Sequence, residues 1–507
     1  MISTPGYCKF SAWKRETEIN KQSFSRVILN SLTAGSPDRC WLKDQTSGRS
    51  ETFGGGVRNT RRLARSLAHL GVEEGRVVCL WSSNYVEYWL LCLAVWELGG
   101  TVLPTNCLTN TERLQQQLVE ASAFIIVCDT YNVDQAITLK QEVSSLKHVL
   151  LLGQEEEVEG VVTVSSLLQS PPDIKVKEVR LDWDKATVMM MYTTRNGESK
   201  VVKHTNKSLI SQVFSPKGAS NNWFDQNVGD CLLCANWFFH FQGLLSFALC
   251  SIQGFTMYFL SEYSDTDLIT ALDDTKVPNA VLYPWQVRML SQSSQLEVHD
   301  LSQLRVIVTG GAILGPTISR ELQEKLPSIR FIRESYGLKE TGLLTYNYPK
   351  YDRSGSSVPD DHLMPVGLPN MWTSFKIIDR ITASPVAGPD LQGELCVKTP
   401  QLSSGYLGQS ESLLDNEGYF HTGDLGYYDR DGIIHFVEQV TGRSVGVGLR
   451  MILVYFGRFP ISSHSGCTRS PPASWSPACC PTPAWRTPPW SPSPTRRTVR
   501  SPGASSS

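Results

Sequence analysis

The chain is 507 residues long, too long for a single hydrophobic core, and typical domain sizes of roughly 100–200 residues predict two to four domains. Its hydrophobic content of 41% and charged content of 19% are ordinary for a soluble globular protein. A formal net charge of -2 argues against nucleic acid as a partner and against bulk attraction to anionic membranes. No apolar run reaches the roughly 18 residues of a transmembrane helix, so we expect no integral membrane segment.

The cysteines and the N-terminus predict a cytoplasmic or peroxisomal protein. The 13 cysteines have no regular spacing, which is typical of reduced thiols rather than of a disulfide framework. Residues Met1–Arg15 lack the apolar core of a signal peptide. Cys231 and Cys234 form a single C-x-x-C inside an apolar run, which we interpret as a buried strand, with a metal or redox pair as the alternative.

Short apolar runs alternate with helix-period segments through most of the chain, which predicts an α/β fold of parallel sheets covered by helices. The predicted buried strands are Arg76–Trp81, Ala123–Cys128, Val149–Leu152, Thr187–Tyr192, Phe255–Leu260, Ala280–Tyr283 and Arg305–Thr309. The predicted helices between them include Asn84–Leu98, Asp265–Asp274, Trp285–Gln292 and Thr317–Lys325.

A smaller β-rich subdomain is predicted at about 366–437. From Val366 the strands become shorter and are interrupted by Gly and Pro, as in Phe375–Asp379 and Gly393–Val397. The large N-terminal domain, this subdomain included, would then span 1–437.

The last part of the chain has a different composition. From Gln439 to Ser507 there is no Asp, Glu or Lys, and the last lysine is Lys398. We expect residues 438–455 to be a hinge with the remnant of a further domain, and residues 456–507, rich in Pro, Ser and Arg, to be disordered. A cationic docking tail is one interpretation, and GC-rich DNA read out of frame is the one we favour.

Four segments and an aromatic cluster around His240 carry candidate site residues. After the strand at Thr187, a hydroxyl- and Gly-bearing loop with a lysine could present donors to phosphates, although an ordinary turn is the alternative. Paired glycines after the strand at Arg305 let a flat ligand approach the backbone, unless they form only a tight turn. The motif residues of these two segments are Thr193, Thr194, Gly197 and Lys200 in the first, and Gly310, Gly311 and Ala312 in the second.

The third and fourth segments carry a tyrosine and two carboxylates. Tyr336 could stack on a base and Glu340 could hold Mg²⁺, with a solvated Lys339–Glu340 pair as the alternative. Asp424, next to a glycine, could accept two hydrogen bonds from ribose hydroxyls. His240 lies in an aromatic cluster that by itself would be a core segment.

Together these segments resemble the adenylate-forming superfamily of acyl-CoA synthetases, 4-coumarate–CoA ligases and beetle luciferases, over roughly Phe24 to Glu438. The resemblance implies ATP, Mg²⁺ and coenzyme A as cofactors or co-substrates and a small-molecule carboxylic acid as the substrate. It implies these roles: phosphate contacts for Thr193, Thr194, Gly197 and Lys200; adenine and acyl contacts for Gly311, Ala312, Tyr336 and Gly337; the acyl pocket for His240; Mg²⁺ for Glu340; ribose for Asp424; and further nucleotide contacts for Lys339 and Gln439.

The chain departs from the family pattern at four places. The phosphate loop is one residue short, with Arg195-Asn196 where the family has Gly and two hydroxyl residues. Lys339 replaces the usual Thr, and Gln439 stands where an Arg follows an acidic residue at the hinge. A lysine of the mobile C-terminal lid has no counterpart after Lys398, so the lid is predicted to be truncated or replaced.

We therefore expect an acid–CoA ligase of the adenylate-forming type, impaired by its phosphate loop and by the lost lid lysine. The alternative is a non-catalytic pseudoenzyme that binds an acyl chain, a nucleotide or a protein partner. Relatives of this kind are cytoplasmic or peroxisomal, and the ending Gly503–Ser507 lacks a peroxisomal Ser-Lys-Leu-type signal.

Overall fold

The computed structural model of this protein describes residues 2–4, 7–9, 21–154, 158–195, 198–213, 229–346, 364–370, 372–386, 388–410 and 412–439. All of them belong to one unit, Met1–Arg458, and the second unit, Phe459–Ser507, lies outside the described residues. The predicted hinge, lid remnant and disordered tail between residues 438 and 507 fall almost wholly outside them too. That division therefore stays a prediction.

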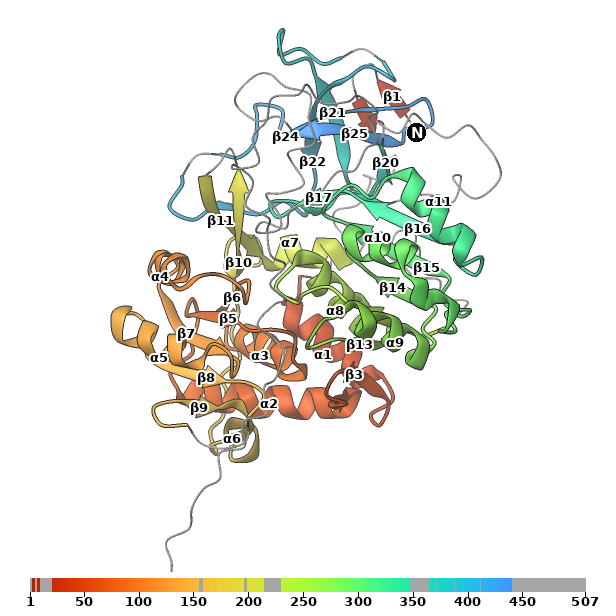
Figure 1. The fold of residues 1–507 in the computed structure, drawn as a ribbon. Coiled ribbons are helices and arrows are strands. Elements are labelled where there is room, and N and C mark those ends of the chain that lie inside the picture. Colours follow the sequence, from red (N-terminus) through yellow and green to blue (C-terminus); the bar gives the residue numbers. More distant parts are fainter. Residues whose placement is uncertain are drawn as a thin grey trace, which may run out of the picture. The chain divides into compact units, whose positions relative to one another are not determined.

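The first sheet is formed mainly by the segments between residues 77 and 205, in the order β23–β11–β10–β6–β5–β7–β8–β9 (Figure 1). Strands β10, β6, β5, β7, β8 and β9 pair in parallel, and β11 is antiparallel to β10. The bounds are Val77–Trp81 (β5), Thr101–Pro104 (β6), Ala123–Cys128 (β7), His148–Leu151 (β8), Val162–Thr163 (β9), Thr187–Arg195 (β10), Glu198–Thr205 (β11) and Gly405–Tyr406 (β23).

The second sheet has the order β16–β15–β14–β12–β13–β3–β4, parallel except for β4. Its bounds are Cys40–Asp44 (β3), Ser50–Thr52 (β4), Cys231–Cys234 (β12), Thr256–Phe259 (β13), Asn279–Val281 (β14), Val306–Gly310 (β15) and Phe331–Ser335 (β16). The C-x-x-C pair thus lies in a strand, as the sequence predicts, and both cysteines are free thiols.

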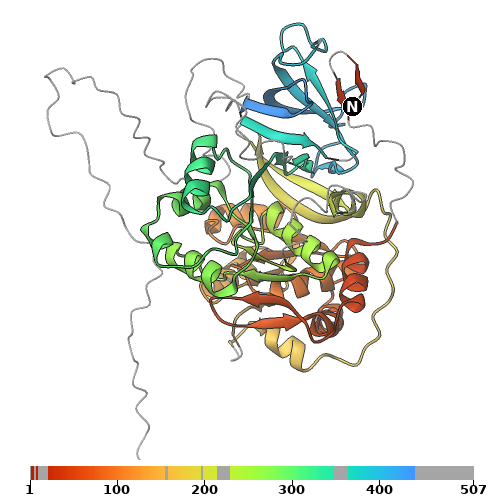
Figure 2. The same cartoon turned by 90° about the vertical axis from the view of Figure 1, so that its right-hand side faces the viewer.

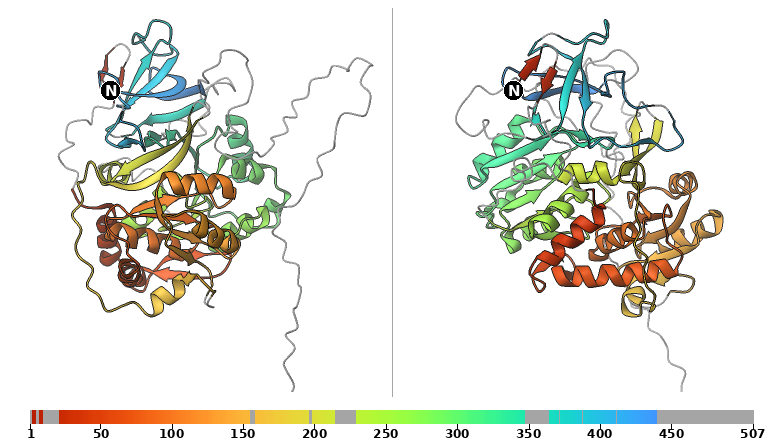
Figure 3. Two further views of the ribbon diagram at one scale, coloured as in Figure 1. Left: turned by 90° about the vertical axis from the view of Figure 1, so that its left-hand side faces the viewer. Right: turned by 180° about the vertical axis from the view of Figure 1, so that it is seen from behind.

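Helices cover both sheets because their apolar faces pack onto the strands. Helices α1, α2, α3 and α8 lie between the two sheets and share one core with them (Figure 3), while α4 and α5 cover the outer face of the first sheet and α9, α10 and α11 that of the second. The helix bounds are Phe24–Ala34 (α1), Phe53–His69 (α2), Val86–Glu97 (α3), Thr111–Glu120 (α4), Val133–Glu142 (α5), Val164–Gln169 (α6), Asn206–Val213 (α7), Phe241–Gln253 (α8), Asp265–Thr275 (α9), Pro284–Gln292 (α10) and Pro316–Lys325 (α11), with a 3-10 turn at Ser294–Glu297.

The third sheet is antiparallel throughout and forms the smaller β-rich subdomain. Its order is β1–β2–β21–β22–β24–β25–β20–β19, and a two-stranded ribbon of β17 and β18 precedes it. The bounds are Ile2–Thr4 (β1), Tyr7–Lys9 (β2), Gly337–Leu338 (β17), Gly342–Leu343 (β18), Thr345–Tyr346 (β19), Met364–Pro369 (β20), Ser374–Ile378 (β21), Gly393–Lys398 (β22), Phe420–Tyr428 (β24) and Ile434–Gln439 (β25).

The predicted α/β class is confirmed: two largely parallel sheets covered by helices, followed by a β-rich subdomain. The predicted strands and helices are found within a few residues of their expected bounds, and Figure 2 shows that the β10–β11 hairpin (yellow) lies between the helix-covered sheets and the β-rich subdomain (blue). One strand is longer than predicted, since β10 continues beyond Tyr192 to Arg195. Among the described residues, no helix has the length and apolarity that would be needed to cross a bilayer.

Candidate active site

Two motifs far apart in the sequence meet at the junction of the second sheet and the β-rich subdomain. Tyr336 follows strand β16 and Asp424 lies in β24, yet the Tyr336 hydroxyl donates a hydrogen bond of 2.7 Å to Oδ2 of Asp424. Both are buried, with 8% and 3% of their surface exposed. Ligands of open α/β sheets bind outside the carboxyl ends of the strands, and Tyr336 lies at such an end.

The segment before Asp424 is fixed by hydrogen bonds to β22. The Thr422 hydroxyl donates to the Leu395 carbonyl at 2.7 Å and accepts from the Asp424 N–H at 3.1 Å. The N–H of Gly423, whose φ is +73°, donates to Oε1 of Glu394 at 3.1 Å. The Asp424 carboxylate is therefore held in place before any ligand arrives.

Gln439 stands directly across from Asp424, because β24 and β25 pair in this register. The strand pairing thus places the backbone of the predicted hinge residue beside that of the ribose motif. Its side chain lies outside the described residues.

Glu394 belongs to a small group of side chains with Cys396 and His421, whose donor atoms lie within 4.8 Å of one another and which is the one such group that the described residues offer to a metal ion. Oε2 of Glu394 is 3.2 Å from Nδ1 of His421. Since the other carboxylate oxygen holds Gly423, we interpret the group as support for the Asp424 segment.

The predicted phosphate loop is a tight β-hairpin. Strands β10 and β11 stay paired as far as Arg195 opposite Glu198, with Thr193 opposite Lys200. Only Asn196 and Gly197 stand between the two strands, and both lie outside the described residues, so the predicted role of Gly197 stays a prediction.

This pairing limits what the hairpin can offer a phosphate. An antiparallel pair engages alternate backbone N–H and C=O groups, so only the outward-facing ones are left for a ligand. The hydroxyls of Thr193, which is buried, and Thr194, which is half-buried, become the main donors. The signal for this hairpin was present in the sequence, because Asn-Gly is the strongest short-range signal of a two-residue hairpin turn.

Lys200 and Glu340 are connected through a tyrosine that sequence reasoning missed. The Nζ atom of Lys200 lies 5.2 Å from the centre of the Tyr406 ring, and the Tyr406 hydroxyl donates to Oε1 of Glu340 at 2.9 Å. Tyr406 lies in β23, which pairs with β11. The structure thus brings Lys200 and Glu340 to one place, 140 residues apart in sequence.

Lys339 and Glu340 do not form the solvated surface pair considered as the alternative. Glu340 is 3% exposed, and the Lys339 ammonium is partly buried and donates to the backbone carbonyl of Tyr192, at the residue before Thr193. Burial lowers the pKa of Lys339 to about 8, although the nearby Glu340 carboxylate opposes that shift. The ammonium therefore lies beside strand β10 of the hairpin, next to Thr193.

The glycines after β15 differ in what they require. A Cβ on Gly310 would lie 2.4 Å from the Ser335 hydroxyl, so close strand packing demands glycine there. Gly311 is an exposed residue with φ +83° and open space around it, and Ala312 beside it is half-buried. Gly337 has no room for a side chain, because a Cβ would lie 2.2 Å from the Gly342 carbonyl.

His240 caps helix α8, and its ring is neutral. Its Nδ1 is 2.7 Å from the Tyr283 hydroxyl, which already accepts a hydrogen bond from the Trp237 N–H at 3.0 Å. If the Tyr283 hydroxyl donates to Nδ1, the proton of the neutral imidazole is on Nε2. Burial, with the charge of Lys339 as the smaller cause, lowers the pKa of His240 to about 3.

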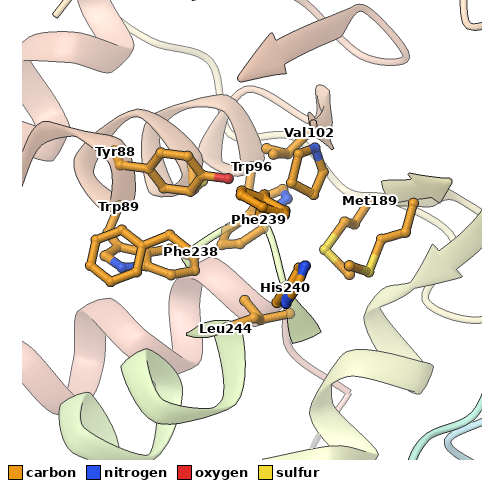
Figure 4. Close-up of a pocket in the computed structure, with 12 residues that line it drawn as sticks. Tyr88, Trp89, Trp96, Val102, Met189, Phe238, Phe239, His240 and Leu244 are labelled. Atoms are coloured by element: carbon orange, nitrogen blue, oxygen red, sulfur yellow. The ribbon is translucent and has the colours of Figure 1, made fainter. Parts of the chain in front are cut away.

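A narrow cavity lies beside His240 and is lined almost wholly by apolar side chains (Figure 4). Two of its lining groups, the Tyr88 hydroxyl and the Trp89 indole N–H, are buried without a hydrogen-bond partner among the described residues. The lining residues are Tyr88, Trp89, Cys92, Trp96, Val102, Pro104, Met189, Met191, Phe238, Phe239, His240 and Leu244.

Asn84 fixes the segment that leads to His240. Its Oδ1 accepts from the Phe238 N–H at 2.8 Å, and its Nδ2 donates to the carbonyls of Asn236 and Leu260 at 3.2 and 3.1 Å. Asn84 is 2% exposed. The polar run Ser82-Ser83-Asn84 after an apolar strand is the sequence signal that could have singled it out.

His204 and Gln212 hold the segment from Tyr336 to Leu343. Nε2 of His204 is 2.7 Å from the Lys339 carbonyl, and Gln212 bonds to the Thr341 carbonyl and the Leu343 N–H at 2.8 and 3.1 Å. His204 lies near the end of the hairpin strand β11, and Gln212 lies in helix α7, which follows it. Sequence reasoning gave no reason to select them.

The buried His204 predicts a loss of stability in acid. Burial lowers its pKa from 6.5 to about 4, so the unfolded chain binds a proton more readily than the folded one. The contribution of the neutral His204 to the free energy of unfolding is complete above pH 6.5. It is lost as the pH falls from 6.5 towards 4, and the total loss is roughly 3 kcal/mol. Urea unfolding at pH 4.5–7.5 should show the stability gap between the wild type and His204→Gln narrowing in acid. A gap independent of pH would contradict this assignment.

The match with known proteins agrees with this geometry. Residues 31–407 match the family described as AMP-binding enzyme. The chain belongs to this family. Among curated AMP-binding relatives, it is 27% identical over 410 residues to peroxisomal OPC-8:0-CoA ligase 1 of Arabidopsis thaliana, covering 78% of this chain and 71% of that protein. It is 26% identical over 419 residues to 4-coumarate–CoA ligase 2 of Oryza sativa subsp. japonica, covering 80% and 72%.

A solved structure at low sequence identity has the same fold. The luciferase-like enzyme from the nonluminescent Zophobas morio mealworm superposes with a TM-score of 0.74 at 21% identity, covering 85% of this chain and 98% of that one. The resemblance to the adenylate-forming superfamily that the motifs carry is thereby confirmed.

The surroundings of Glu340 fit a divalent cation poorly. One carboxylate oxygen already accepts the Tyr406 hydrogen bond, and the Lys339 ammonium acts on the same carboxylate. Mg²⁺ demands near-octahedral oxygen coordination, and an ammonium beside it would repel it. The magnesium role of Glu340 stays a prediction that these neighbours do not favour.

Proposed function

We propose that this protein is an acid–CoA ligase of the adenylate-forming type, weakened at its phosphate-binding hairpin. The reaction would join a carboxylate oxygen to the α-phosphorus of ATP with release of pyrophosphate, and the acyl group would then pass to the thiol of coenzyme A with release of AMP. The observation that carries the proposal is the meeting of Tyr336 with Asp424, and of Lys200 with Glu340, in a chain of the AMP-binding family.

The nucleotide would lie between the carboxyl end of β16 and strand β24. Asp424 would accept the ribose hydroxyls and Tyr336 would pack against the adenine, beside Gly311, Ala312 and Gly337. Lys200 would contact phosphate oxygens, with the hydroxyls of Thr193 and Thr194 as donors. Such donors stabilise the charge that develops on the phosphate in the transition state, and one lost donor costs on the order of 3 kcal/mol.

The acid would bind next to His240. The protonated Nε2 of a neutral imidazole is a hydrogen-bond donor that carries no charge, suited to the oxygen of a carboxylate or an acyl phosphate. The apolar cavity beyond it favours a substrate whose chain is apolar. The substrate class would therefore be an apolar carboxylic acid, and the setting cytoplasmic or peroxisomal.

Impairment is expected at the adenylation step, because the paired hairpin offers few backbone donors to the phosphates. We expect slow adenylation, which in turn limits the transfer to coenzyme A.

A panel of apolar acids tests this directly. Purified protein is incubated with ATP, an acid and coenzyme A, and pyrophosphate and acyl-CoA are measured separately. We expect acid-dependent pyrophosphate release about 100-fold or more below typical kcat values of roughly 10 per second, and less acyl-CoA than pyrophosphate. Equal, rapid formation of both would overturn the impairment.

A second candidate is a pseudoenzyme that binds a nucleotide or an acyl chain without reaction. The paired hairpin favours it, because that change lies within the adenylation site rather than in the C-terminal segment. Nucleotide binding by calorimetry together with no acid-dependent pyrophosphate release, even after long incubation, would select this candidate.

A further inference from the structure

The charge around Glu340 is unusual for a site that would hold a nucleoside triphosphate together with a divalent cation. The Lys339 ammonium donates a hydrogen bond to the Tyr192 carbonyl in strand β10 of the hairpin, next to Thr193. The ammonium also lies within electrostatic range of Glu340 and His240, since the Glu340 carboxylate raises the pKa of Lys339 and the Lys339 charge lowers the pKa of His240.

A second lysine is linked to the same carboxylate through a tyrosine. Lys200 lies over the ring of Tyr406, whose hydroxyl bonds to Glu340. Two lysines from separate parts of the chain are therefore connected to one buried carboxylate, Lys339 by its charge and Lys200 through Tyr406. Lys200 also has Glu198 at 3.5 Å, but Glu198 is largely exposed and its charge is screened by solvent.

The Glu340 carboxylate, which would hold the divalent cation, already has an ammonium group as its counter-charge. Glu340 neutralises part of the ammonium charge, and the remaining positive charge lies beside the hydroxyls that would bind phosphate oxygens. A compact ammonium is a normal phosphate partner, as in the lysine of phosphate-binding loops. A dication placed against Glu340 would be repelled by the Lys339 ammonium, which is within electrostatic range of that carboxylate.

We propose that Lys339, together with Lys200, takes the place of the divalent cation, so that this site binds a nucleoside triphosphate without Mg²⁺. The inference rests on the proposed nucleotide site and adds to it the charge state of the ligand, which would be the free polyphosphate anion. Lys339 is then a ligand-binding residue that distinguishes a triphosphate from a monophosphate.

Calorimetric titration of the full chain tests this. ATP is titrated in EDTA and again in excess Mg²⁺, at the same ionic strength, and AMP is titrated in both buffers. For the wild type we expect ATP affinity in EDTA to equal or exceed the affinity in Mg²⁺. For Lys339→Thr we expect at least a tenfold loss of ATP affinity in EDTA, part of which Mg²⁺ restores, and an AMP affinity changed less than threefold.

The matched control is Lys185→Thr, an exposed lysine paired with Asp182 and away from these residues, which should behave as the wild type in all four titrations. Thermal melting of each variant verifies that it is folded. Lys339→Met supplies a second variant of similar length without charge, and it should lose ATP affinity in EDTA without gaining a response to Mg²⁺ as large as that of the threonine variant.

The outcomes separate the two claims. Wild-type ATP binding that is at least tenfold weaker in EDTA than in Mg²⁺ overturns the role of Lys339 and leaves the nucleotide site intact. Wild-type protein that binds neither ATP nor AMP in either buffer overturns the proposed function, and with it this inference.

Discussion

Replacing Asp424 with asparagine should weaken the binding of both ATP and AMP by about 10- to 100-fold. A hydrogen bond to a charged group contributes about 1.5–3 kcal/mol, and each 1.4 kcal/mol is a factor of ten in affinity. Asparagine keeps the size of the side chain but offers one acceptor oxygen in place of two and carries no charge. The effect should be equal for the two nucleotides, because the ribose is common to them.

The control for this variant lies on the same hairpin. Asp431→Asn removes an equal charge from the exposed turn between β24 and β25 and should leave both affinities unchanged. The Tyr336 hydroxyl can still donate to the asparagine oxygen, so Asp424→Asn should stay folded. A folded Asp424→Asn protein that binds ATP and AMP as tightly as the wild type would show that the ribose does not lie at Asp424.

Replacing Asn84 with alanine should lower the free energy of unfolding by about 3 kcal/mol. The substitution leaves the Phe238 N–H and the carbonyls of Asn236 and Leu260 buried without this partner. An unsatisfied buried group costs about 1–3 kcal/mol, and partial relaxation keeps the total below the sum of three such costs. Urea unfolding with an unchanged m-value measures the loss.

An exposed asparagine supplies the comparison. Asn110 caps helix α4 by accepting from the Arg113 N–H at 3.0 Å, and Asn110→Ala should cost only about 1 kcal/mol. The Asn84 variant should in addition have a lower rate of reaction with the carboxylic acid substrate, since the segment that ends in His240 is held less firmly. If both alanine variants lose the same stability, Asn84 does not fix that segment as the structure indicates.

Many strands and helices of the core could be predicted from the sequence, because local patterns of apolar residues indicate which segments are buried. The run at Val77–Trp81 is apolar at every position, and it forms a strand buried along its whole length. Helix α3 is apolar on all sides and was predicted for the same reason. Such patterns can be recognised without knowing what each element contacts.

Helices α1, α2 and α8 were not among the predicted elements, although each contributes to the central core. Helix α2 begins Phe-Gly-Gly-Gly, and glycine is among the poorest helix formers. Glycine is favoured at both positions, because a Cβ on Gly56 would lie 2.6 Å from the Trp41 ring and one on Gly55 would meet the Glu51 carboxylate. Close packing against β3 and β4 overrides the local preference.

The candidate site divides in the same way. The sequence alone determined which family this chain resembles and which residues belong to its motifs, because motif residues such as Tyr336, Glu340 and Asp424 are fixed by order and spacing along the chain. Only the tertiary structure decided that Lys339 turns inward to the hairpin, that Tyr406 connects Lys200 to Glu340, and that Asn84 and His204 hold the loops. The physical reason is that these contacts join segments up to 206 residues apart, and a side chain's partner and charge environment depend on how the sheets pack rather than on its neighbours in sequence.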